Sequence, residues 1–350
     1  ALALTAALVV GMTLPAFADT WYIEDGDISI SAGTSGNHVE QGEKKQDETT
    51  ETIITNREST ASSNTVTIEA GEGKTVDVTL KNVNIDASSG AAVSVTGKGD
   101  TNIELNGNNT LTSGSGHAGL EHNKETNSEG KETSGTLTIM DNNNDGKLTA
   151  NGGIDGAGIG GSDEHDGQVT ITGGEITATG GNGAAGIGGG AGDKYTAVGG
   201  DGDVTISGGT ITATGGRLGA GIGGGAYGNG TVTVTDGDIT AKATGRYGAG
   251  IGGGCGEIPK DTLIGGNGTV TISGGTITEA SGGYMAAGIG SGFQGLGTVT
   301  IEGDAVIKNA QGGKAGAGIG SGTRGDSNIL IRGDAAVSYT HLKLPTKLEV

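Results

Sequence analysis

The sequence has 350 residues, of which 77 are Gly and only 3% are aromatic, which argues against a globular core of packed helices. Its net charge of −20 disfavours nucleic acids and anionic membranes as partners, because their phosphate groups would repel the chain. Neutral sugars, cations and anions that meet a local basic patch remain as candidate ligands.

The first 18 residues are predicted to be the remnant of a secretory signal peptide. Ala1–Leu14 is apolar and uncharged, and Ala16-Phe17-Ala18 fits the small-x-small cleavage rule, which places the mature start near Asp19. The apolar run is too short for a transmembrane helix. We therefore expect a secreted or cell-surface protein with no membrane span in this part of the chain.

Residues 19–63 are expected to form the N-terminal end of the fold. Trp21–Ser31 reads as a first strand, in which Trp21 seals the open end of the core. Gly36–Ser63 is polar and charged, so we expect a loop or a partly ordered cap there. From Asn64 to Gly116, apolar residues alternate with polar ones, which predicts irregular early coils of a repeat; the clearest are Val76, Val78, Leu80, Ile103 and Leu105.

From about residue 136 one unit recurs along the chain. Its most regular phrase is Ala-Gly-Ile-Gly, which begins at Ala157, Ala185, Ala220, Ala249, Ala287 and Ala317. A Val-Thr-Ile phrase and an Ile-Thr-Ala phrase lie between the copies. Each unit thus contains three short runs with period-two alternation, separated by Gly pairs, and this pattern is typical of β-strands.

Such units can bury their few Ile and Val side chains only by stacking on one another. Three strands in a coil of about 29 residues predict a right-handed parallel β-helix over residues 64–336. Gly208–Gly209 and its equivalents would supply the positive φ of a sharp corner, and the Gly residues of the Ala-Gly-Ile-Gly phrase would let a third strand pack closely. A β-propeller and a calcium-binding β-roll fit the period and composition less well.

The stretch "VDVTLKNVNIDASSGAAVSV", followed by "TLTI", "GKLTA" and the "GAGIGGG" coils, resembles secreted carbohydrate-binding β-helix proteins of anaerobic Gram-positive bacteria. The resemblance covers roughly residues 64–334 and is carried mainly by structural motifs. It implies a fold similar to that of pectate lyases, binding to cell-wall polysaccharide, and an association with calcium. It assigns no binding residue in this chain.

One predicted corner of the stack carries basic and aromatic side chains on successive coils. The candidate ligand-binding residues there are Arg217, Arg246, Tyr247, Tyr284 and Lys314. An anionic group would relieve the repulsion between neighbouring Arg side chains, and a Tyr ring could stack on a sugar. This hypothesis of a groove for an acidic glycan competes with the interpretation that the corner is simply a solvated, charged edge.

Carboxylates gather at another predicted corner. Asp163, Asp166 and Asp201, with Glu164, Asp193 and Asp203, come from loops of neighbouring coils and would suit calcium. Asp141, Asn143 and Asp145 match the start of a calcium loop, although Gly152 replaces its final Glu. The alternative is an ordinary Asn/Asp turn. Calcium is therefore a candidate cofactor.

Three other functions remain alternatives. No motif singles out a catalytic pair for a lyase or a hydrolase, and a stiff adhesin or spacer would need no site at all. Thr columns, such as Thr177, Thr212, Thr240 and Thr278, also resemble ice-binding surfaces. The lone Cys255 is expected to be a small buried filler. Residues 337–350 break the repeat, resemble a translated sequencing adaptor and are expected to be non-native.

Overall fold

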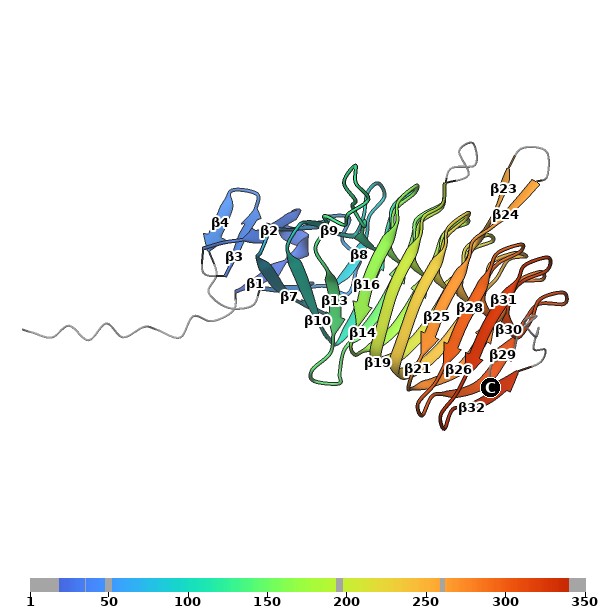
Figure 1. The fold of residues 1–350 in the computed structure, drawn as a ribbon. Helices are drawn as coiled ribbons and strands as arrows, with labels where there is room; N and C mark the ends of the chain where they lie inside the picture. Colours follow the sequence, from blue (N-terminus) through green and yellow to red (C-terminus); the bar gives the residue numbers. More distant parts are fainter. Residues whose placement is uncertain (1–18, 35, 48–51, 193–197, 259–261, 340–350) are drawn as a thin grey trace, which may run out of the picture.

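The chain winds into a stack of β-strand coils, as Figure 1 shows from the N-terminal (blue) to the C-terminal (red) end. The computed structural model describes residues 19–34, 36–47, 52–192, 198–258 and 262–339. Apart from the 3-10 turn η1 (Ile23–Asp25), the regular elements in these ranges are β-strands. The predicted right-handed parallel β-helix is confirmed, whereas the predicted signal peptide lies outside the described residues.

Each coil contributes strands to three faces. Face A contains β7 (Thr75–Lys81), β10 (Asp100–Asn106), β13 (Leu137–Met140), β16 (Gly167–Ile171), β25 (Gly268–Ile272), β28 (Gly297–Ile301) and β31 (Ser327–Ile331). Face B contains β8 (Asn84–Asp86), β11 (Asn108–Thr112), β14 (Lys147–Asn151), β17 (Glu175–Thr179), β26 (Thr276–Ser281), β29 (Val306–Gln311) and β32 (Ala336–Tyr339). The long strands β19 (Gly202–Gly215) and β21 (Gly230–Ala243) run through both faces, so A and B form one sheet.

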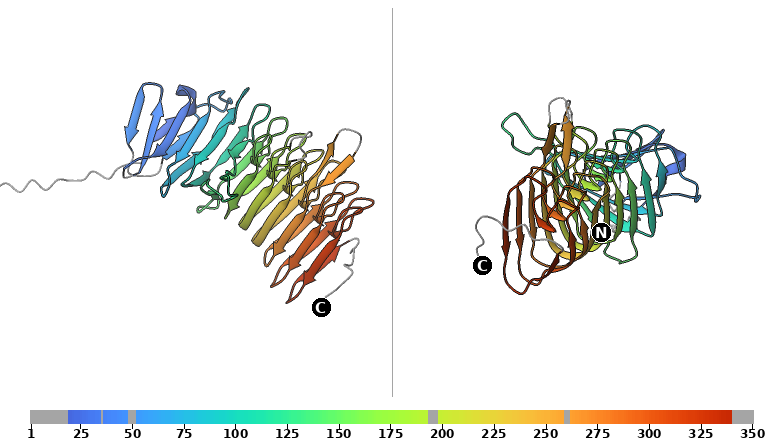
Figure 2. Two further views of the ribbon diagram at one scale, coloured as in Figure 1. Left: turned by 45° about the horizontal axis from the view of Figure 1, so that its top comes forward. Right: turned by 90° about the vertical axis from the view of Figure 1, so that its right-hand side faces the viewer.

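Face C is a second sheet, made mostly of very short strands. It contains β6 (Val66–Ala70), β9 (Val93–Gly97), β12 (Leu120–His122), β15 (Ile159–Gly160), β18 (Ile187–Gly188), β20 (Ile222–Gly223), β22 (Ile251–Gly252), β27 (Ile289–Gly290) and β30 (Ile319–Gly320). The hairpin of β23 (Cys255–Ile258) and β24 (Thr262–Gly265) projects between faces C and A. Viewed from the C-terminal end, the faces surround a common interior (Figure 2, right).

The interior is one continuous hydrophobic core, because equivalent residues of successive coils lie side by side. Ile187 pairs with Ile222 and Ile222 with Ile251 on face C, while Val204 pairs with Val232 on face A. The residues of both columns are buried. Burying an Ile or Val side chain stabilises the fold by about 1.5–3 kcal/mol. The predicted stacking of Ile on Ile is therefore confirmed.

Glycines make the corners and the narrow third face possible. Gly209 and Gly237 have φ of +89° and +108° at the corner between faces A and B. On face C, Gly223 has φ +126°, and a Cβ atom there would lie 2.1 Å from the carbonyl oxygen of Gly252. An L side chain at Gly223 would thus be strained and would also collide with the next coil.

Short strands complete the N-terminal end. They are β1 (Thr20–Tyr22), β2 (Ile28–Ala32), β3 (Asn37–Gln41), β4 (Lys44–Asp47) and β5 (Thr52–Thr55). The segment expected to be a loop or cap thus contains three strands, because Asn37, Val39 and Gln41 alternate inward on β3. Strand β4 is the edge of sheet C, where its lysines protect the open edge. Trp21 is buried in the core with Lys44 Nζ 3.7 Å from its ring centre.

Two details of the C-terminal half differ from the sequence pattern. A register shift places Glu279 rather than Thr278 opposite Thr240, so the predicted Thr column on face B is interrupted. Of the segment predicted to be non-native, Val337–Tyr339 continues in strand β32, which pairs with β29, and the rest lies outside the described residues. In the ranges that the structure covers, no helix is long and apolar enough to span a bilayer.

Candidate functional site

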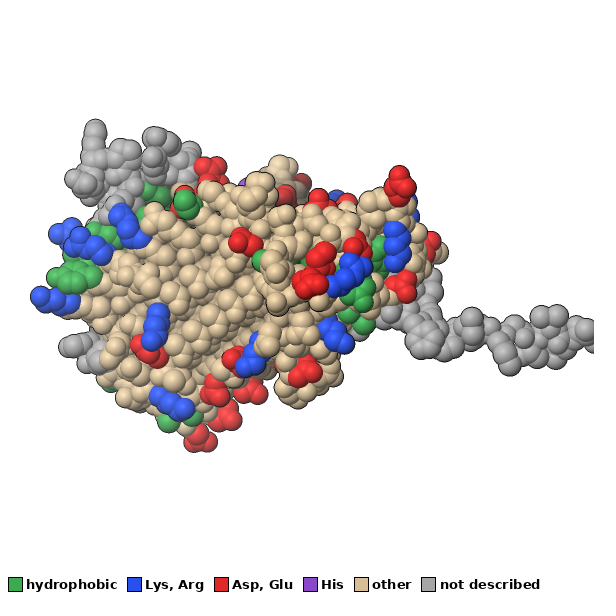
Figure 3. All heavy atoms as spheres, turned by 180° about the vertical axis from the view of Figure 1, so that it is seen from behind, with side chains coloured by type: hydrophobic (Ala, Val, Ile, Leu, Met, Phe, Trp, Pro, Cys, Tyr) green, Lys and Arg blue, Asp and Glu red, His purple; other side chains and the backbone are tan. Residues whose placement is uncertain are grey.

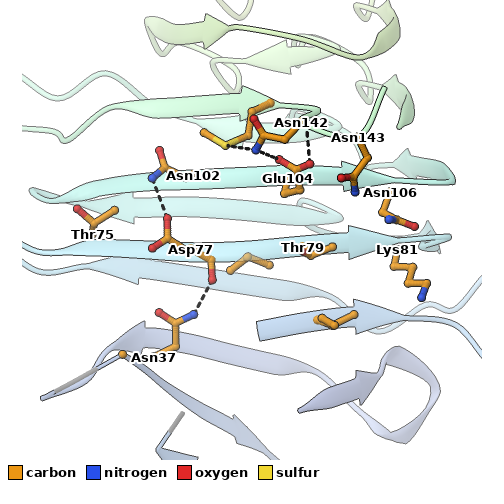
Figure 4. Close-up of a pocket in the computed structure, with 14 residues that line it drawn as sticks. Asn37, Thr75, Asp77, Thr79, Lys81, Asn102, Glu104, Asn106, Asn142 and Asn143 are labelled. Atoms are coloured by element: carbon orange, nitrogen blue, oxygen red, sulfur yellow. Dashed lines mark hydrogen bonds between the residues drawn. The ribbon is translucent and has the colours of Figure 1, made fainter. Parts of the chain in front are cut away.

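A polar groove of about 760 Å³ lies on face A over the N-terminal coils (Figure 4). Strands β7 and β10 form its floor, and the residues that follow β13 close one side. We call this the face A groove. Its polar lining residues include Asn37, Thr75, Asp77, Thr79, Lys81, Asn102, Glu104, Asn106, Asn142 and Asn143, and its half-buried apolar ones are Ile53 and Met140.

The alternation of the strands explains why these side chains face outward. Val76, Val78 and Leu80 point into the core and are buried, as the sequence predicted. Successive side chains of a strand point to opposite faces, so Asp77 and Lys81 must point outward. Strand β10 repeats the pattern in register, which places Asn102 directly beside Asp77.

Hydrogen bonds fix the floor of the face A groove. Asn102 Nδ2 donates to Asp77 Oδ1 at 2.8 Å. Asn37, which is buried, donates from Nδ2 to Thr52 Oγ1 at 2.8 Å and to the carbonyl oxygen of Asp77 at 2.7 Å. Asp77 is thus held through both its side chain and its backbone, and strands β3, β5, β7 and β10 are tied together at this point.

A second set of hydrogen bonds holds the side of the groove. Glu104 accepts from the backbone N–H of Asn142 at 2.8 Å and from Asn142 Nδ2 at 2.7 Å. The Asn142 side chain also contacts Met140 Sδ at 3.6 Å. Figure 4 shows Asn142 and Asn143 above the strand that carries Glu104 and Asn106. Glu104 therefore positions this loop beside the floor.

The groove offers hydrogen-bond donors and acceptors that are held in place. Its lining combines amides, hydroxyls, two carboxylates and one ammonium group. Asp77 and Glu104 both accept hydrogen bonds from amide N–H groups. The arrangement suits the binding of a polar, hydroxyl-rich ligand.

The predicted basic and aromatic residues are brought to one corner, between faces B and C. Arg217, Arg246, Tyr284 and Lys314 are exposed there. Tyr247, however, is only 8% exposed and packs with Cys255 and Phe293. Its ring is therefore not open for stacking on a sugar, in contrast to the expectation. Cys255 is buried, as the expectation of a filler requires.

The predicted calcium loop forms a turn in which a side chain bonds to backbone N–H groups of the same loop. The carboxylate of Asp141 accepts from the N–H groups of Asp145 at 3.2 Å and Gly146 at 3.1 Å. Asp141 and Asp145 border a hollow of about 240 Å³. Asn143 instead lines the face A groove, so the three predicted ligands do not face one common space.

Asp166 and Asp201 belong to a hydrogen-bonded column, which we call the Asp/Asn ladder. Asp166 Oδ1 accepts from the N–H of Asp201 at 2.7 Å, and Asp201 Oδ1 accepts from the N–H of Asn229 at 2.7 Å. Asn229 and Asn267 continue the series, each accepting from the next coil. Burial, followed by the charge of Asp201, raises the pKa of Asp166. Two of the predicted metal ligands therefore join successive coils.

Asp163 lies next to this ladder but is not part of it. Burial raises its pKa, and the charges of Asp155 and Glu164 add to this effect. Among the residues with described positions, no three His, Cys, Asp or Glu side chains are grouped so that they could hold a metal ion. Asp193, another predicted ligand, lies outside the described residues.

The alternation of apolar residues predicts the strands of the face A groove but not the groove itself. The inward Val and Leu residues indicate β7 and β10, but the predicted site residues do not include the outward Asp77, Asn102 and Glu104. The available signal was the polar run of Asp77, Thr79 and Lys81 beside Asn102, Glu104 and Asn106. This polar run indicates a groove only when the register between β7 and β10 is known, because the register decides which outward side chains lie side by side.

A comparison with protein-family models agrees with the fold. A family model described as "Beta helix repeat" matches residues 144–163, 169–191, 204–226 and 270–293. A polysaccharide lyase-like protein from C. thermocellum, solved as a gadolinium derivative, is similar over 90% of this chain and 100% of its own. Its sequence identity is 15% and the TM-score is 0.32. No curated protein matches the sequence.

Proposed function

We propose that this protein binds an extended polysaccharide in the face A groove. The observation that supports the proposal most is the fixed polar floor, in which Asn102 holds Asp77 at 2.8 Å and Glu104 holds Asn142 at 2.7 Å. Sugar hydroxyls donate and accept hydrogen bonds at once, so a lining of amides and carboxylates is complementary to them. The secreted or surface location predicted from the leader-like segment would bring the groove to such polymers.

The rigidity of the groove supports binding. Its main residues project from strands β7 and β10, whose seven paired positions keep the spacing of the side chains constant. Side chains that are held before the ligand arrives lose little conformational entropy on binding. The groove also lies on a continuous face, and its floor column runs on through Thr138 and Thr170. A chain polymer could therefore extend beyond the groove along face A.

A double substitution tests the groove. Asp77→Ala with Asn102→Ala removes the joined pair, and we expect about ten-fold weaker binding of the best ligand from a panel of neutral and acidic polysaccharides. Isothermal titration calorimetry on the whole chain measures the affinity. Thr177→Ala with Thr212→Ala is the matched control, because these two residues are also outward neighbours on paired strands but lie on face B, away from the groove. Equal binding by the two double variants would contradict the proposal.

A stiff spacer is the second candidate function. The continuous core from Trp21 to Ile329 favours it, since a rod of this kind holds its two ends at a fixed separation without any ligand. The same polysaccharide panel separates the two functions. A spacer would bind none of the polymers, whereas a binding module retains at least one in pull-down and in calorimetry.

Calcium binding stays a prediction, centred on Asp141 and Asp145 or on Asp163 beside the Asp/Asn ladder. A cation near Asp163 would relieve the repulsion from Asp155 and Glu164 that helps to raise its pKa. We expect the melting temperature to be higher in millimolar calcium than in EDTA, with magnesium as the control ion. An unchanged melting temperature would dismiss calcium as a structural cofactor.

A further inference from the structure

A second surface with different chemistry lies on both sides of the short face C strands in the C-terminal coils. Arg246, Tyr284 and Lys314 come before these strands, at the corner with face B, and Arg324 follows β30 in the turn toward face A. The N–H of Thr323 donates to the carbonyl oxygen of Met285 at 2.8 Å, which joins that turn to the corner. We propose that this surface, formed by Arg246, Tyr284, Lys314 and Arg324 and called the basic corner, binds a carboxylate-bearing polysaccharide. It lies outside the face A groove, and the proposal stands whether or not the groove binds a sugar. Figure 3 shows Lys and Arg side chains beside hydrophobic ones at the left-hand, C-terminal end of the molecule.

Backbone hydrogen bonds define the spacing of the basic corner. The N–H of Met285 donates to the carbonyl oxygen of Arg246 at 2.8 Å, and the N–H of Ala315 donates to that of Tyr284 at 3.0 Å. Arg246, Tyr284 and Lys314 therefore occupy equivalent positions on three successive coils. Because neighbouring strands lie about 4.8 Å apart, the backbones of Arg246 and Lys314 are about 10 Å apart along the stack.

The two Arg side chains of the basic corner lie over aromatic rings. The Arg246 guanidinium carbon lies 5.6 Å from the ring centre of Tyr247 and 5.7 Å from that of Tyr284. Arg324 lies 6.0 Å from the ring of Phe293, which packs edge-on against Tyr247 at 6.2 Å. Tyr247 and Phe293 are buried, whereas Tyr284 is 42% exposed. The corner thus presents two Arg side chains and one open Tyr ring on a packed base.

The basic corner gathers cations on a chain that as a whole is strongly acidic. In the part of the chain that the structure describes, Arg246, Lys314 and Arg324 form no ion pair with Asp or Glu. Elsewhere, Lys242 pairs with Glu279 at 2.8 Å and Lys124 with Asp203 at 2.8 Å. An external anion would neutralise the corner and remove the repulsion between its cations.

The arrangement favours an acidic glycan over other polyanions. The planar guanidinium fork fits a carboxylate through two parallel hydrogen bonds. Tyr284 belongs to the coil between that of Arg246 and that of Lys314. Its exposed ring offers an apolar surface on which a sugar ring can stack. A polymer lying along the stack would meet a cation, a ring and a second cation in turn. A phosphate chain or an acidic peptide would make no use of the ring in this way.

A charge-matched pair of variants tests the proposal in the whole chain. Arg246→Gln, Lys314→Gln and Arg324→Gln together should weaken binding of polygalacturonate about ten-fold at low salt. The control is Lys74→Gln, Lys98→Gln and Lys131→Gln, which changes the net charge equally at exposed residues of the N-terminal half. Calorimetry gives the affinities, and circular dichroism confirms that each variant folds. Equal weakening in both variants, or no binding by the unaltered chain, would overturn the proposal.

Further variants and polymers in the same binding experiment identify the chemistry of the ligand. Tyr284→Ala should weaken polygalacturonate binding but leave binding of polyphosphate and poly-glutamate unchanged. If polyphosphate or poly-glutamate binds more tightly than polygalacturonate, the ligand of the basic corner is a phosphate chain or an acidic peptide. That result would contradict the proposal. Asp77→Ala with Asn102→Ala should leave polygalacturonate binding intact, which separates the basic corner from the face A groove.

Discussion

At the scale of single residues, the same side chain type performs different tasks according to its position in a coil. Asp77 is held on the floor of the face A groove by Asn102, Asp141 closes a turn, and Asp166 joins two coils in the Asp/Asn ladder. From the sequence alone, Asp141 and Asp166 were equally good calcium ligands. What distinguishes them is the set of N–H groups that each carboxylate meets, and these groups belong to a different coil for Asp166.

The Asp/Asn ladder gives a pH-dependent prediction. Burial raises the pKa of Asp166 in the folded state, so the stability that its protonated form contributes is present at low pH and is lost as the pH rises through that value. Asn229 and Asn267 occupy the same position in later coils without a charge. Asp166→Asn should therefore raise the melting temperature at pH 7.

The gain from Asp166→Asn should shrink as the pH falls below the ordinary Asp pKa of about 4, where the carboxyl group is neutral in both states. Melting curves over a pH series measure this difference between the variant and the unaltered chain. Asp86→Asn, at an exposed position, is the control and should show no such pH dependence. A variant that is less stable at pH 7 than the unaltered chain would show that the charge of Asp166 is needed.

At the scale of elements, strand patterning and Gly positions predicted the coils well. Alternating Val, Ile and Thr residues identified faces A and B, and the Ala-Gly-Ile-Gly phrase identified face C, because burial imposes a period of two on a strand. Strand β3 could not be predicted because its outward His38 and Glu40, and the polar residues among its inward ones, hide the alternation. Strand β4 could not be predicted because it buries none of its four residues. The bulge at Thr278 was also not predictable, since a single extra residue leaves the local pattern intact.

Close packing between coils on face C gives a prediction for Gly223. Gly223→Ala combines a positive φ with a Cβ atom 2.1 Å from the carbonyl oxygen of Gly252, so we expect a loss of stability on the order of 3 kcal/mol. Gly42→Ala is the matched control, because Gly42 also has a positive φ, of +59°, but has open space around it. It should cost about 1 kcal/mol. Equal losses in urea unfolding would mean that coil packing tolerates the methyl group.

At the scale of the whole molecule, stacking converts distant sequence positions into neighbours, and both proposed sites depend on this. The basic corner could be anticipated because its residues recur at one position of a regular repeat. The face A groove could not, because the early coils are irregular and Asn37 reaches Asp77 from a segment forty residues away. Tyr247 was expected at the exposed surface because the adjacent column carries Arg and Lys residues. Instead, a second small core of Tyr247, Cys255 and Phe293 buries it.

The central claim, that the face A groove binds a sugar chain, is tested most directly by a crystal structure of the whole protein soaked with a neutral oligosaccharide from the best-binding polymer. The account predicts sugar density on strands β7 and β10, with ring hydroxyls in hydrogen-bond contact with Asp77 and Asn102. Sugar bound only at another surface, with the groove holding solvent, would contradict it.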